Sequence, residues 1–221
     1  LDICDALAEG SGSNDASCRT VTYIPSKDVY PHTKIVDYGS GCTTESGITR
    51  SGKKFVTVYA DENTAPAGKV ISVTTFSNYY VDGVSIGGNV KISVVSPATP
   101  GPLALRTVET KVVADASGNT TTYINTSNRK PIGGASTTWT SDDVFQMTAD
   151  AHGTEVDGDS AMIVWKYNSD PANPIIKMAD CPFRAQGGLQ INLKQNGAIT
   201  KEYLDYGNGD CDDAATLSVN N

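Results

Sequence analysis

The sequence predicts an all-β fold, an antiparallel meander of about 12 strands that folds into a two-sheet sandwich or a curled roll. Three observations lead to this prediction. The chain has 21 Gly, 10 Pro and 10 Tyr but 3 Met, which favours strands and turns over helices. Dipeptides typical of tight turns separate the extended runs, at Asp82-Gly83, Gly118-Asn119, Asp157-Gly158 and Asn196-Gly197. No segment with helical periodicity lies between these runs.

Strands are predicted wherever Val, Ile, Thr and aromatic residues gather between turn signals. They lie near residues 19–24, 33–38, 53–60, 69–80, 84–95, 103–114, 120–125, 143–150, 160–167, 186–195, 198–206 and 213–219. The Pro-rich stretch at 96–102 is the clearest break, but each half would then need a second sheet of its own. We therefore expect residues 18–221 to form a single domain, preceded by a flexible tether at 1–17 that has room for one helical turn.

Four of the five cysteines fall into a repeated frame, in which a Cys opens a hairpin whose second strand ends in Asp-Tyr-Gly and a second Cys closes the unit. The frame predicts disulfides between Cys18 and Cys42 and between Cys181 and Cys211, with Cys4 left unpaired. Disulfides indicate an oxidising compartment. Since the sequence does not start with Met, we also expect that a leader has been removed or lies outside this sequence.

The frame also predicts strand register. If Cys18 lies opposite Cys42, then Thr22 pairs with Tyr38 and Ile24 with Val36. In the second copy the Asn196-Gly197 turn places Gln195 opposite Ala198. An extra residue in the first strand, at Gly187-Gly188, would then bring Cys181 opposite Cys211.

The Asp-Tyr-Gly motif itself is interpreted as a strand end. Asp37 and Asp205 are expected to accept hydrogen bonds from the backbone amides that follow, while the glycines allow the chain to reverse. The strands around the second copy alternate apolar and polar residues. The apolar rows are Leu189, Ile191 and Leu193 in one strand and Ala215, Leu217 and Val219 in another, and both rows are expected to pack on a partner sheet.

The chain carries a formal net charge of −8 and has no cluster of Lys or Arg, which excludes nucleic acid as a partner. Its apolar runs are far shorter than the ~20 residues that cross a bilayer, so no transmembrane segment is expected.

Three segments together resemble a family of uncharacterised secreted proteins and lipoprotein ectodomains of Bacteroidetes. They are "KIVDYGSGCTTESGITRSGKKFVTVYA", "FSNYYVDGVSIGG" and "CPFRAQGGLQINLKQNGAITKEYLDYGNGDCDDAATLSVN". The resemblance covers about residues 18–221, and residues 1–17 lie outside it. It implies an exported, extracytoplasmic protein of the cell envelope or surface, and it implies no activity.

Calcium is the metal that the sequence favours most, because Asn208, Asp210, Asp212 and Asp213 lie close together after the second Asp-Tyr-Gly. The spacing does not match an EF-type loop, which would need Gly at position 213 and Glu at position 219. The preferred interpretation is a solvated acidic turn, with no metal and no cofactor.

Four aromatic residues, Tyr79, Tyr80, Trp139 and Trp165, are candidates for a surface on which a sugar could stack. Packing within the sheet is the alternative that we prefer, since both faces of the "AMIVWKYN" strand are apolar.

No nucleophile motif and no metalloprotease motif is present. We therefore expect a non-catalytic binding or structural module, with a glycan or an envelope protein as partner. The alternative is a surface enzyme that cleaves glycans through paired carboxylates, which leave no sequence motif.

Overall fold

The computed structural model describes residues 18–43, 47–98, 103–134, 142–156, 162–212 and 214–220. The predicted tether at 1–17, with Cys4, lies outside these residues, and so do the turn at Asp157-Gly158, Trp139 and Asp213. The strands are β1 (Thr20–Ile24), β2 (His32–Asp37), β3 (Cys42–Thr43), β4 (Thr49–Val58), β5 (Val70–Val81), β6 (Val84–Ser96), β7 (Ala104–Ala114), β8 (Thr120–Gly133), β9 (Val144–Val156), β10 (Met162–Ser169), β11 (Ile175–Met178), β12 (Gln186–Gln195), β13 (Ala198–Asn208) and β14 (Thr216–Asn220).

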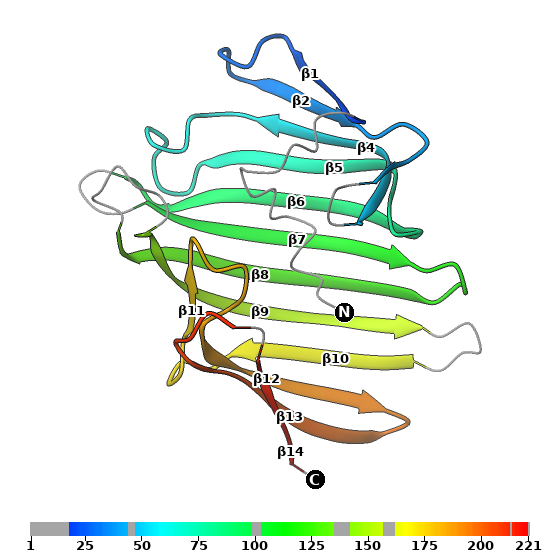
Figure 1. Ribbon diagram of the computed structural model, residues 1–221, viewed down its shortest axis with the longest axis vertical. Helices are drawn as coiled ribbons and strands as arrows, with labels where there is room; N and C mark the ends of the chain where they lie inside the picture. Colours follow the sequence, from blue (N-terminus) through cyan, green and yellow to red (C-terminus); the bar gives the residue numbers. More distant parts are fainter. Residues whose placement is uncertain are drawn as a thin grey trace.

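The all-β class and the antiparallel meander are confirmed. The described strands form one sheet rather than two packed sheets, with the order β1-β2-β4-β5-β6-β7-β8-β9-β10-β12-β13-β14 (Figure 1). β3 continues the position of β2, because both pair with β4. β11 continues the position of β10 in the same way, because both pair with β9 and β12. The described residues of the sheet therefore occupy twelve strand positions.

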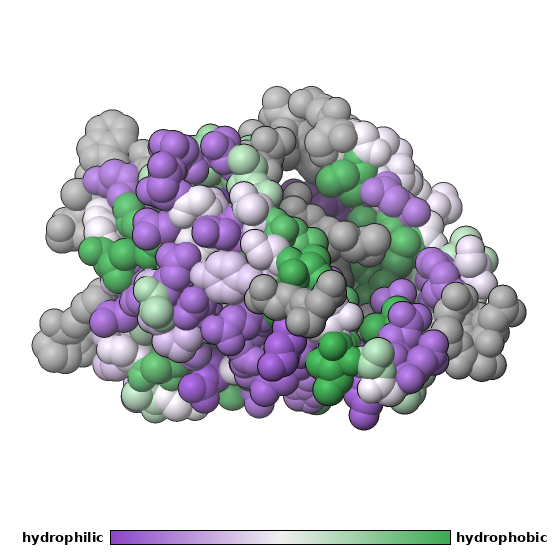
Figure 2. Space-filling view, turned by 90° about the horizontal axis from the view of Figure 1, so that it is seen from below, coloured by the Kyte–Doolittle hydropathy of each residue, from purple (hydrophilic) through white to green (hydrophobic). Residues whose placement is uncertain are grey.

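Most of the buried side chains of the strands lie on one face of this sheet, which we call the inner face. A row across it runs from Val90 through Glu109, Asn125 and Ala151 to Tyr167, and parallel rows contain Val94 with Leu105 and Val36 with Lys54. Seen from below, the molecule is hollowed, and hydrophobic side chains border the hollow (Figure 2). Successive side chains of a strand point to opposite faces of the sheet. When the sheet curls, the side chains on its concave face are therefore buried.

The strands β8 and β9 extend well beyond the predicted runs at 120–125 and 143–150. The added part of β8, Thr126–Gly133, is mostly polar, so it carries no apolar alternation from which a strand could be predicted. It is a strand because the backbones of β7 and β9 hydrogen-bond to it from both sides.

The C-terminal meander has the predicted register but not the predicted burial. Gln195 lies opposite Ala198 and Ile191 opposite Glu202. Leu189 is buried and Ile191 is half-buried, but Leu217 and Val219 are each 53% exposed. Ala215 is exposed as well. The prediction of a partner sheet over this row is wrong for the described residues, because the described strands form one sheet and nothing among them covers the face of β14.

The structure joins the cysteine pairs that the frame predicts, Cys18 to Cys42 and Cys181 to Cys211, with Cα atoms 5.3 and 5.6 Å apart. The predicted register of the first hairpin is wrong by three residues, since Thr22 lies opposite Ile35 and Ile24 opposite Thr33. Cys42 belongs to β3, beyond the turn after β2, so this disulfide does not span the β1–β2 ladder.

The predicted bulge in the second hairpin lies at the expected place but in the other strand. Gly188 pairs with Asp205 and Gln186 with Asn208, so the extra residue is in β13. Gly207 provides the conformation for it, with φ +92°. Cys181 precedes β12 and reaches Cys211 through the loop after β11, which the hydrogen bond from Gly209 N to Ala185 O (2.8 Å) holds against β13.

Candidate functional site

The two Asp-Tyr-Gly turns are built in the same way. Asp37 Oδ1 accepts a hydrogen bond from Gly39 N, and Asp205 Oδ1 accepts one from Gly207 N, each at 2.9 Å. The tyrosines then pack differently: Tyr38 is buried, whereas Arg184 donates to the Tyr206 hydroxyl (2.8 Å) and lies over its ring. The first copy ends β2 at Asp37, as the sequence predicts, whereas the second copy lies inside β13 at the bulge, so the predicted strand end is wrong there.

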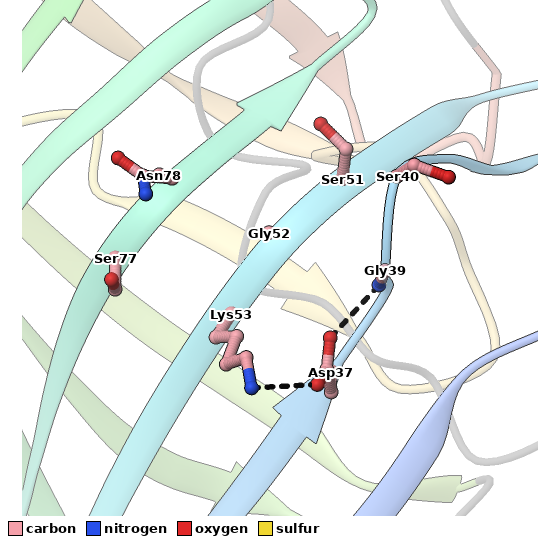
Figure 3. Close-up of a pocket in the computed structure, with 8 residues that line it drawn as sticks. All are labelled: Asp37, Gly39, Ser40, Ser51, Gly52, Lys53, Ser77 and Asn78. Atoms are coloured by element: carbon pink, nitrogen blue, oxygen red, sulfur yellow. Dashed lines mark hydrogen bonds and ion pairs between the residues drawn. The ribbon is translucent and has the colours of Figure 1, made fainter.

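The first turn borders a polar hollow of about 440 Å³ on the outer face (Figure 3). Its wall is made by Asp37, Gly39, Ser40, Ser51, Gly52, Lys53, Ser77 and Asn78. A Cβ atom on Gly52 would lie 1.8 Å from Asn78 O, so β4 and β5 approach here as closely as only glycine allows. Asp37, the one carboxylate of this described wall, forms an ion pair with Lys53 at 2.8 Å.

The Lys53 ammonium, and after it the Gly39 amide, lowers the pKa of Asp37. Replacing Asp37 with Asn keeps an acceptor for Gly39 and removes the charge. A carboxyl with a lowered pKa stabilises the folded state above its ordinary pKa of 3.8, and this contribution is lost as the pH falls through the folded-state value. In urea denaturation, the variant should be less stable than the wild type at about pH 7, and the difference should vanish at about pH 2. A difference that persists in acid would contradict the ion-pair explanation.

The calcium candidates border a smaller hollow of about 180 Å³, beside the second turn. Two of the carboxylate oxygens there already accept backbone hydrogen bonds. Asp205 Oδ1 accepts one from Gly207 N, and Asp212 Oδ1 accepts one from Ala214 N at 3.0 Å. Among the described residues no group of three His, Cys, Asp or Glu side chains is placed to hold a metal ion. Asn208, Asp210 and Asp212 thus border one turn without forming such a group.

Tyr203, in β13, holds the loop between β10 and β11 in place. The Tyr203 hydroxyl donates to Asp170 Oδ2 (3.0 Å) and accepts from Asn173 Nδ2 (3.3 Å). The Asn173 amide lowers the pKa of Tyr203, but burial and the Asp170 carboxylate outweigh it and raise the pKa. A Cβ on Gly188 would lie 2.1 Å from this hydroxyl, so Tyr203 also fills the space that the glycine leaves. This cluster stabilises a chain reversal.

The predicted aromatic candidates do not gather at one place. Tyr79 is 3% exposed and packs with Val36 and Tyr38 in the core near β2. Tyr80 follows it on the outer face and is 39% exposed. Trp165 lies in β10, and β6, β7, β8 and β9 separate it from β5. The four-residue platform is therefore not formed by the candidates that the structure describes.

Trp165 instead belongs to another aromatic group, which we call the aromatic shelf and define as Tyr123, Trp165 and Tyr167. The rings of Trp165 and Tyr167 are nearly parallel, at 4°, with centroids 5.7 Å apart, and Tyr123 lies 5.9 Å from Trp165. Gly153 makes this arrangement possible, because a Cβ there would lie 2.6 Å from the Trp165 ring. Trp165 and Tyr167 are half-buried, on the inner face of β10.

Charged and polar side chains continue the same rows of the inner face. Lys111 lies opposite Tyr123, and Glu109 lies opposite Asn125. Lys111 Nζ and Glu109 Oε2 are 3.6 Å apart, with side chains 2% and 7% exposed. Asn125 Oδ1 is buried and accepts no hydrogen bond from any described residue. The face thus combines flat apolar rings with a buried ion pair and an amide oxygen.

Most of this group could not be selected from the sequence. Trp165 is one of the predicted candidates, but the place of Tyr123 beside it depends on which strands are neighbours. The spacing of Trp165 and Tyr167, two residues apart in one strand, is the one local signal that places both rings on the same face.

No protein-family model matches the chain, and comparisons with curated proteins and with solved structures find no similar protein. Within the described residues, no helix is both long and apolar enough to cross a membrane.

Proposed function

We propose that this chain is an exported module of the cell envelope or cell surface that binds a partner without catalysing a reaction, and that it belongs with the Bacteroidetes secreted proteins that it resembles. The aromatic shelf is its binding surface, and the ligand is a saccharide. The parallel rings of Trp165 and Tyr167 are the observation that carries this proposal.

The two disulfides support the location. Such bonds persist in oxidising compartments and are rare in the cytosol. The negative net charge agrees with a surface that does not attract anionic lipid head groups.

The chemistry of the shelf supports the ligand class. A sugar ring has an apolar face that packs on an aromatic ring, and its hydroxyl groups need hydrogen-bond partners at the rim. Trp165 and Tyr167 provide the rings, and the amide of Asn125 lies in the row that contains Tyr167. The carboxylate of Glu109 is paired with Lys111 in the same part of the inner face.

The test is calorimetric titration of the oxidised protein with a panel of soluble polysaccharides, neutral and acidic. The wild type should bind at least one of them, and Trp165→Ala should weaken that binding at least about tenfold, which is 1.4 kcal/mol. Val164→Ala, on the outer face of the same strand, is the matched control and should bind as the wild type does. Failure of the wild type to bind any polysaccharide, or equal binding by Trp165→Ala, would contradict the proposal. Release of new reducing ends from the bound polysaccharide would favour the enzyme alternative instead.

A further inference from the structure

In the part of the chain that the structure describes, both outer strands of the sheet have an unpaired edge. Each pairs with one neighbour among the described residues, β1 with β2 and β14 with β13, and Figure 1 shows them at opposite ends of the longest axis. All five side chains of β1 are exposed, and so are those of Thr216 to Val219 in β14. Each outer strand therefore presents a row of backbone donors and acceptors to its surroundings.

Neither edge strand carries the charged residues or prolines that commonly prevent pairing. The sequences TVTYI and TLSVN contain no Lys, no Arg, no acidic residue and no Pro. Inward-pointing charges, prolines and bulges are the common protections of an exposed edge. Two uncharged edges of five residues each are suited to pairing with another strand.

The direction of the strands matches a second copy of this chain. The described strands occupy twelve positions, and every neighbouring pair among them is antiparallel, so β14 runs opposite to β1. A copy that continues the sheet with the same face inward brings its β1 next to β14 with antiparallel polarity. The added strand then continues the alternation of the whole sheet.

The side chains match as well. Val21 and Tyr23 lie on the inner face of β1, and Leu217 and Val219 lie on the inner face of β14. The outer face carries hydroxyls on both strands, Thr20 and Thr22 in β1 and Thr216 and Ser218 in β14, and Ile24 at the end of β1. If Thr22 lies opposite Ser218, then Val21 meets Val219 and Tyr23 meets Leu217. Apolar and hydroxyl pairs of this kind stabilise neighbouring strands.

We propose that copies of this chain assemble head to tail, with β1 of one copy paired to β14 of the next, into an open filament with a continuous sheet. The two surfaces that meet are different, so the contact is heterologous and does not close on itself unless the accumulated rotation closes a ring. The assembly depends on the edge strands β1 and β14 and not on the aromatic shelf. A failure of assembly would therefore leave the proposal of saccharide binding standing, and the reverse holds as well.

The experiment uses sedimentation velocity and electron microscopy on the oxidised full chain. The wild type should form species whose mass grows with concentration. Val21→Lys blocks β1, and Leu217→Lys blocks β14, so each variant alone should sediment as a monomer. An equimolar mixture should form dimers and nothing larger, because one intact β14 and one intact β1 remain. Thr122→Lys places the same charge on an exposed site in the middle of the sheet and should assemble as the wild type does.

The register has its own test. Combining Val21→Lys with Val219→Glu in one chain places opposite charges across the proposed contact, and assembly should return. A wild type that stays monomeric at its highest soluble concentration would overturn the proposal. Dimers formed by either blocked variant alone would overturn the head-to-tail arrangement, since they require like edges to meet. Circular dichroism of each variant checks that the monomers are folded. Dimer formation in the mixture is a second check, because pairing requires folded edge strands in both variants.

Discussion

Replacing Cys181 and Cys211 together with Ser is expected to lower the free energy of unfolding by about 3 to 4 kcal/mol. The disulfide closes a loop of 30 residues in sequence separation, and the cost follows from the entropy that the unfolded chain regains when the loop opens. Urea denaturation of the variant and of the oxidised wild type measures the difference directly.

The other disulfide provides the matched comparison. Cys18 and Cys42 are separated by 24 residues, so the chain-entropy model gives the pair nearly the same contribution. Equal losses for the two double variants would support an effect on the unfolded state. A loss below about 1 kcal/mol for either would mean that the reduced chain keeps the loop ends together, or that native strain cancels the gain.

Turn chemistry determined how well strand register could be predicted. Asn196 and Gly197 leave two residues between β12 and β13, so pairing follows from one dipeptide, and Gln195 lies opposite Ala198 as expected. Between β1 and β2 the chain has Pro25 to Pro31 and no two-residue turn signal. The predicted register there relied on the cysteines alone, and it was wrong because Cys42 lies beyond a further turn, in β3.

The strand β7 explains why the polar part of the inner face could not be predicted. In "VETKVV" the apolar Val108 and Val112 alternate with Glu109 and Lys111, and the usual interpretation assigns the valines to the core. The structure has the opposite arrangement: Val112 is 42% exposed, and Lys111 is 1% exposed. Which face is buried depends on how the whole sheet curls, and no local pattern contains that information.

The same arrangement makes the stability of the fold depend on Glu109, which is buried and paired with Lys111. Glu109→Gln is expected to lower the free energy of unfolding by about 3 to 5 kcal/mol. The reason is that Lys111, 2% exposed at its side chain, would keep a charge in the interior with no carboxylate to balance it. Denaturation in urea measures this loss, and the double variant Glu109→Gln with Lys111→Met should recover most of it, since a neutral pair of similar volume leaves no buried charge.

An exposed ion pair on the same sheet provides the control. Lys166 Nζ lies 4.0 Å from Asp150 Oδ2, and both side chains are more than half exposed, so Lys166→Met should cost less than about 1 kcal/mol. Equally small losses for Glu109→Gln and Lys166→Met would mean that water reaches the inner face beside the aromatic shelf. A large loss that the double variant recovers would instead show that the inner face is dry at Glu109. A saccharide bound at Trp165 and Tyr167 would then lie against a desolvated charge pair, and its hydroxyl groups would form hydrogen bonds there without competition from water.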